Sequence, residues 1–131
     1  MKVLIVEPGK RARIGEIGDD LKSTQNAVGG YIEVVYPFED PDVVLVCNEE
    51  GKLTGMDLNR ALRSEDGEIY DIVAGTFFVA GLSEDDFTSL PDDLMEKYKK
   101  MYDLPERFAR INDEFIAIKY NPQKQVNLDE R

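Results

Sequence analysis

The densest basic cluster in the sequence directly follows a Pro-Gly turn. It consists of Lys10, Arg11 and Arg13. Arg side chains bind phosphate and carboxylate groups through a planar fork of N–H donors. The surrounding residues do not form a phosphate loop, because the pattern G-x-x-x-x-G-K-[ST] is absent. We therefore predict that this cluster could hold a small anion.

Two further groups of residues could contact a ligand. Gly29 and Gly30 offer bare backbone N–H groups beside Tyr31, an aromatic ring on which a base could stack. The alternative, which we favour, is a glycine helix stop that feeds a strand and leaves Tyr31 in the core. Asn59 and Arg60 could orient a ligand, although such residues more often cap turns or pair with nearby acids. The candidate ligand site thus comprises Lys10, Arg11, Arg13, Gly29, Gly30, Tyr31, Asn59 and Arg60.

The composition argues against catalysis. The chain has no His and a single cysteine, Cys47, which excludes Ser-His-Asp triads, Cys-His dyads, His-containing zinc sets and an intrachain disulfide. Cys47 follows an apolar run, as a small buried hydrophobe would. The acidic turns lack the ligand spacing of a calcium-binding loop, and no carboxylate pair stands out. We predict a protein that is not an enzyme and needs no cofactor or metal.

The negative charge is concentrated in the middle of the chain. The 131 residues contain 16 Lys and Arg against 27 Asp and Glu, a net charge of -11. Residues 39–93 hold fifteen of the acids and three of the bases. Such a segment repels phosphate backbones and anionic membranes. Its turns either contact a partner protein or simply confer solubility, and the residues predicted for the contact are Glu39, Asp40, Asp42, Glu65, Asp66 and Glu68.

The hydrophobic pattern predicts an α+β fold. It indicates a single compact domain over residues 1–120, with a mostly antiparallel, short-stranded sheet, two principal helices and a polar tail over 121–131. The helices are expected at about 19–28 and between Pro91 and Leu104, the second capped by Ser89. Its apolar face would carry Leu94, Tyr98 and Met101. Strands are expected at 2–7, 11–17, 31–36, 43–47, 69–73, 76–79 and 114–120, and short helical segments at 56–62, 85–90 and 106–111, with a bulge at Gly75.

Four motifs in order resemble a family of unknown function. They are Val28-Gly29-Gly30-Tyr31-Ile32-Glu33, Asn48-Glu49-Glu50-Gly51-Lys52, Leu58-Asn59-Arg60-Ala61 and Ile72-Val73-Ala74-Gly75-Thr76. The family is one of small proteins from Gram-positive bacteria, their phages and mobile elements, and the resemblance covers roughly residues 1 to 82. It brings no catalytic residues. It implies an accessory role in a mobile element, in a setting where counter-defence proteins are common neighbours.

Two functional hypotheses follow. The first is a cytoplasmic, non-enzymatic accessory protein that binds a host component through its acidic surface, in counter-defence. The second is a protein that binds or sequesters a small nucleotide-like signal through the basic cluster and Tyr31, for which burial in a homo-oligomer is expected. Neither involves a nucleic-acid backbone or a membrane. The N-terminus lacks a signal peptide pattern and no apolar run is long enough to span a bilayer.

Overall fold

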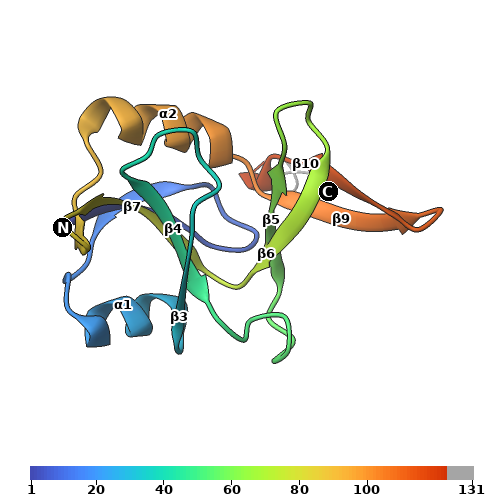
Figure 1. Ribbon diagram of the computed structural model, residues 1–131. Coiled ribbons are helices and arrows are strands. Elements are labelled where there is room, and N and C mark those ends of the chain that lie inside the picture. The colour runs from blue at the N-terminus through green and yellow to red at the C-terminus, as the bar shows by residue number, and fades with distance from the viewer. Residues whose placement is uncertain (124–131) are drawn as a thin grey trace.

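A six-stranded antiparallel sheet forms the body of the protein. The computed structural model describes residues 1–123, and Figure 1 shows the arrangement. The strand order is β2-β1-β7-β4-β3, with β8 paired to β7. This confirms the predicted α+β class with mainly antiparallel strands. The bounds are β1 (Lys2–Val6), β2 (Arg13–Glu16), β3 (Ile32–Val35), β4 (Val43–Asn48), β7 (Phe77–Ser83) and β8 (Asp86–Thr88).

The central strands are apolar on both faces because a helix covers each side of the sheet. In Figure 1, α2 (Asp92–Tyr102) lies on one side and α1 (Leu21–Val28) on the other. Alternate residues of β4 therefore enter two separate cores. Leu45 packs in the core beneath α2, whereas Val44 packs in the core with Val28 of α1. This explains why the strands read as continuous apolar runs.

The two helices lie close to their predicted positions, but the predicted cap and part of the predicted apolar face of α2 differ in the structure. Asp20 caps α1, where its carboxylate accepts from the Ser23 N–H at 3.1 Å. The residue before α2 is Pro91, and no side chain caps that helix. The prediction of a Ser89 cap is wrong, because the Ser89 hydroxyl instead accepts from the Lys2 N–H at 2.8 Å. The buried face of α2 carries Met95, Tyr98 and Tyr102. The prediction that Met101 lies on this face is wrong, because its side chain is exposed.

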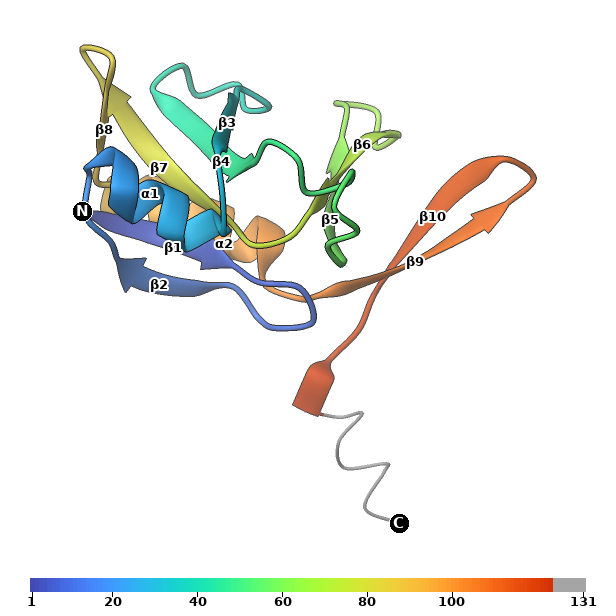
Figure 2. The ribbon, with the colours of Figure 1, turned by 90° about the horizontal axis from the view of Figure 1, so that it is seen from below.

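Two further hairpins extend from the body. The first, β5 (Leu58–Arg63) with β6 (Ile69–Ala74), is inserted between β4 and β7. The second, β9 (Glu106–Ile111) with β10 (Glu114–Lys119), follows α2 and projects away from the sheet, as Figure 2 shows.

The three short helical segments predicted from sequence are strands. Residues 56–62 contribute to β5, 85–90 to β8 and 106–111 form β9. In β5 the pairing with β6 overrides the helical spacing of Leu58 and Leu62. β8 and β9 belong to hairpins whose two-residue turns, Glu84-Asp85 and 112–113, have positive φ at both residues. Such turns match strand twist and favour Asn and Asp. Gly75 also has positive φ (82°), and it forms the turn from β6 into β7 rather than a bulge.

Candidate functional site

A buried guanidinium joins three separate parts of the chain. Arg60 on β5 is 1% exposed. Its Nε and Nη2 donate to the Tyr102 carbonyl at 3.1 and 3.0 Å, and Nη2 also donates to the Lys10 carbonyl at 2.7 Å. Its Nη1 donates to Asn59 Oδ1 at 2.8 Å. Arg60 therefore connects the inserted hairpin to the end of α2 and to the loop after β1.

Asn59 extends this network to the sheet. Its side chain is fully buried, and its Nδ2 donates to the carbonyls of Val6 at 2.9 Å and Gly75 at 2.8 Å. Burial lowers the pKa of Arg60, and the nearby Glu106 carboxylate opposes that shift. An arginine stays protonated in proteins nonetheless. Both side chains thus bind the protein's own backbone, instead of presenting polar atoms to a ligand at the surface.

Glu106 lies next to this network and could not be identified from the sequence. Its side chain is 2% exposed. Its Oε1 accepts from the Ala61 N–H and its Oε2 from Arg63 Nη2, both at 2.8 Å. The carboxylate therefore fixes the start of β9 against β5. No local motif signals such a contact, because 45 residues separate Glu106 from Ala61 along the chain.

A groove of about 710 Å³ lies between the inserted hairpin, α2 and the loop that joins β3 to β4. Volumes of this size are typical of binding sites. The Arg60 network and Glu106 hold the inserted hairpin, which supplies one wall. The aromatic and thioether side chains that line the groove are Tyr36, Phe38, Tyr70, Tyr98, Tyr102 and Met101.

The aromatic lining is partly fixed and partly exposed. Phe38 packs on Tyr98 with ring centroids 4.4 Å apart, and the Tyr98 hydroxyl donates to the Asp40 carboxylate. Burial and the Asp40 carboxylate raise the pKa of Tyr98, so its hydroxyl stays protonated. Tyr36 and Tyr70, in contrast, are 64% and 58% exposed. The groove therefore has a packed aromatic floor, to which Phe38 and Tyr98 contribute, and two exposed rings at its sides.

The unpaired charges around the groove are acidic. Its two cations already have carboxylate partners: Lys97 Nζ lies 2.8 Å from Asp40, and Arg63 bonds Glu106. The hydrogen bonds from Lys97 and Tyr98 lower the pKa of Asp40, which therefore stays ionised. Two acids from separate turns complete the rim, Glu39 and Glu65.

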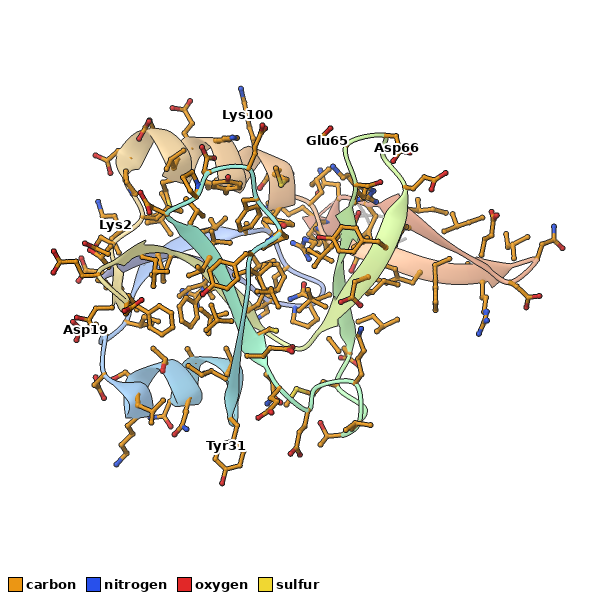
Figure 3. All side chains as sticks on the ribbon, viewed as in Figure 1. Lys2, Asp19, Tyr31, Glu65, Asp66 and Lys100 are labelled. Atoms are coloured by element: carbon orange, nitrogen blue, oxygen red, sulfur yellow. The ribbon has the colours of Figure 1, made fainter. Side chains whose placement is uncertain are left out.

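The structure thus brings together parts of the predicted acidic surface. Glu39 and Glu65 line one groove although they lie in different turns. Figure 3 shows Glu65 and Asp66 at the tip of the inserted hairpin. The hydroxyl of Ser64 and the Glu68 N–H both bond Asp66, which lowers its pKa. Asp42 lies exposed just before β4.

The predicted ligand site divides into separate places. The basic residues are each engaged in surface ion pairs: Arg11 Nη1 with Asp103 at 2.7 Å, and Lys10 and Arg13 with Glu7 at 3.7 and 3.1 Å. Asn59 and Arg60 are buried, whereas Tyr31 is exposed. The lining of the cavity at Tyr31 contains no basic residue and consists of Gln25, Asn26, Gly29, Gly30 and Tyr31.

The glycine pair has the structural role that we favoured. Gly29 ends α1 with a φ of 79°, and the N–H groups of Gly29 and Gly30 both donate to the Gln25 carbonyl, at 2.8 and 3.0 Å. The helix stop is therefore confirmed. The expectation that Tyr31 enters the core is wrong, because its side chain is 68% exposed. It precedes the edge strand β3, where no further strand covers it.

The single thiol lies in the sheet. Cys47 is buried on β4, and burial beside Glu33 raises its pKa to about 11. A thiol with so high a pKa is a poor nucleophile at neutral pH. Within residues 1–123, no three His, Cys, Asp or Glu side chains gather in a way that could hold a metal ion.

The chain belongs to an uncharacterised family. The model of the family described as "Domain of unknown function (DUF3846)" matches residues 1–103, which run from β1 through α2. Every groove residue except Glu106 falls within this range. No curated protein and no solved structure matches the chain. Among residues 1–123, none of the helices has the length and apolarity needed to cross a membrane.

Proposed function

We propose that this protein is a non-enzymatic binding module whose groove takes a basic and apolar segment of another protein. The observation that carries the proposal is the combination of exposed aromatic rings, Tyr36 and Tyr70, with a rim whose unpaired charges are acidic. Exposed apolar surface rimmed by polar groups is typical of protein-binding sites.

Each part of the groove suits one part of such a segment. Aliphatic side chains would pack against Met101 and the ring of Phe38. Cationic side chains would lie over the exposed tyrosine rings, where a cation is attracted to the ring face. Glu39 and Glu65 would pair with further cations at the rim, an arrangement that contributes more to association rate and specificity than to affinity.

The floor of the groove offers a polar contact for the backbone of a bound segment. Among the described residues, the Tyr102 hydroxyl makes no hydrogen bond, and burial raises its pKa so that it remains a donor. A protonated hydroxyl can donate to a backbone carbonyl of an extended peptide. An extended segment with alternating basic and apolar side chains would use all three features.

The nucleotide hypothesis gains no comparable support. A phosphate in the groove would face Glu39 and Glu65, and the local cations Arg63 and Lys97 are already paired. Outside the groove, the cavity at Tyr31 is lined by Gln25, Asn26, Gly29, Gly30 and Tyr31, without a cation that could hold a phosphate beside a stacked base. The sequence resemblance suggests that the module belongs to a phage or mobile element. We therefore include in the same proposal that its partner is a host component and that binding serves counter-defence.

Fluorescence anisotropy with a labelled peptide tests the proposal. The probe is a ten-residue peptide that alternates arginine with leucine. Two matched probes replace every arginine by glutamate or every leucine by serine. We expect binding in the micromolar range for the first probe and at least tenfold weaker binding for the other two. Equal binding of the first and third probes would show that charge alone attracts the peptide, which contradicts the groove.

Paired variants locate the binding. Tyr70→Ala should weaken the first probe about two- to fivefold, the size of an exposed cation–π contact. Tyr31→Ala is the matched control, because it removes an equally exposed tyrosine outside the groove. Glu65→Lys should weaken binding and reduce its salt dependence, whereas Glu16→Lys on β2 should have a smaller effect. If both members of each pair act alike, the proposed site is wrong.

A further inference from the structure

We propose that the outer face of the β9–β10 hairpin is a self-complementary surface on which a second copy of this chain docks. This inference goes beyond the proposed function, since the hairpin face is separate from the groove and residues 106–119 lie outside the range matched by the family. The observation that prompts it is a two-stranded ribbon that projects from the body (Figure 2) with apolar side chains exposed.

The strand register shows which side chains share that face. Antiparallel partners lie on the same side of a ribbon, and side chains alternate along each strand. Arg107 pairs with Ile118, Ala109 with Ile116, and Ile111 with Glu114. These three rows form one face, and the other face begins with the buried Glu106 that anchors the hairpin to β5.

The exposed face is strongly apolar for a surface ribbon. Ile111 and Ile118 are 52% and 60% exposed, and Ile116 and Ala109 between them are exposed as well. A two-stranded hairpin is marginally stable in water unless something packs on it. At the base of this hairpin, Glu106 bonds the Ala61 N–H of β5, and Arg107 lies over the ring of Tyr120, the residue that follows β10.

The positions of the charged residues on this face match those of a second copy of the same chain. The cation, Arg107, stands in the row at the base, and the anion, Glu114, stands in the row at the tip. A two-fold interface uses the same patch on both subunits. When two such faces stack with base against tip, Arg107 comes beside Glu114 of the partner subunit at both ends, and the isoleucines meet between them.

The net charge of the whole molecule also favours the hairpin as the place where two copies meet. Two chains of net charge -11 repel each other over most of their surfaces. The hairpin is the exception, because residues 106–119 contain three acids and three bases. It also projects beyond the acidic body (Figure 2), so that two copies can meet through it at the lowest electrostatic cost.

The dimensions of the ribbon limit the strength of the contact. Six residues of strand span about 20 Å, and two strands with their side chains are about 10 Å wide, so each copy buries roughly 200 Å². A stable dimer buries about 800 Å² per partner. We therefore expect a dimer with a dissociation constant of tens to hundreds of micromolar, which sedimentation velocity detects when protein concentration is raised to about 1 mM.

Charge exchange provides the decisive experiment. Arg107→Glu and Glu114→Arg should each weaken self-association about tenfold or more, since each variant places like charges together at both ends of the dimer. An equimolar mixture of the two variants should associate as a heterodimer, because both of its charge pairs are then attractive. The double variant should likewise recover self-association. Arg110→Glu is the matched control, because its side chain lies on the opposite face, over the Phe115 ring.

The outcomes separate this inference from its rivals. A chain that remains monomeric at about 1 mM overturns it. Self-association that persists in both single variants, or a mixture that stays monomeric, also overturns it, since either result means that the two charges do not meet. Circular dichroism of each variant checks that the fold is retained. Peptide binding in the groove should be unchanged in all of these variants, so the failure of one proposal leaves the other intact.

Discussion

Replacing the buried Arg60 tests the structural reasoning most directly. Arg60→Met keeps an unbranched apolar stem at this position but removes every donor. Four acceptors then lose the guanidinium: the carbonyls of Tyr102, Lys10 and Asn59, and Asn59 Oδ1. The inserted hairpin would no longer be joined to the end of α2, and one wall of the groove would lose its support.

The expected cost follows from these contacts. An orphaned buried acceptor costs about 1 to 3 kcal/mol. Relief from holding a buried charge offsets part of that sum. The net loss of unfolding free energy should be about 3 kcal/mol, which lowers the melting temperature by roughly 10 °C for a domain of this size. Arg60→Lys should cost nearly as much, because a single ammonium cannot reach acceptors that lie in different directions.

Urea unfolding followed by circular dichroism measures the effect. Arg13→Met is the control, since Arg13 has a 56% exposed side chain and an ion pair with Glu7. Exposed pairs of this kind contribute about 1 kcal/mol at most. If Arg60→Met loses no more stability than Arg13→Met, the assignment of Arg60 as the connection between the hairpin and α2 is refuted. We also expect Arg60→Met to weaken peptide binding in the groove.

Three further predictions use other parts of the structure. Cys47, with a pKa raised to about 11, should react with a disulfide reagent at pH 8 about a hundredfold more slowly than an unperturbed thiol of pKa 9.0, and unfolding in urea should abolish the difference. Hydrogen bonds lower the pKa values of Asp20, Asp40 and Asp66 below 3.8 in the folded protein. As pH falls, the unfolded chain therefore binds protons at these groups before the folded chain does, and the melting temperature should fall as pH drops from about 5 to 2. A melting temperature that does not change over this range would contradict the prediction. Glu106→Gln should cost about 1 to 3 kcal/mol in urea unfolding, because the bond to Arg63 loses its charge, and an equal cost at an exposed glutamate would argue against the buried contact.

The sequence predicted those parts of the fold that depend on local patterns. The apolar runs that form β1 and β4, the glycine stop at Gly29 and the helix α2 between Pro91 and Leu104 are all present in the structure. The errors lie where a distant partner decided the outcome. Leu58 and Leu62 have helical spacing, yet β6 pairs with this segment and makes it a strand.

For the candidate site too, the sequence predicted only what depends on composition and local pattern. The concentration of acids between Glu39 and Asp93 is readable from the chain, and so is the argument against His-dependent catalysis. The groove could not be predicted from the sequence, since Tyr36, Tyr70 and Tyr102 come from three parts of the chain that meet only in the folded protein. Arg60 shows the limit most clearly, because its motif is evident in the sequence but its partners, Lys10 and Tyr102, are distant along the chain.

The sequence by itself therefore determined the class of the fold, the burial of Cys47 and the acidic character of the middle segment, because these depend on composition and on the periodicity of neighbouring residues. Only the tertiary structure decided which charges remain available. It paired Arg63 with Glu106 and Lys97 with Asp40, and it left Glu39 and Glu65 at the rim of one aromatic groove. The physical reason is that an ion pair or a buried hydrogen bond depends on distance in space, which the order of residues along the chain does not specify.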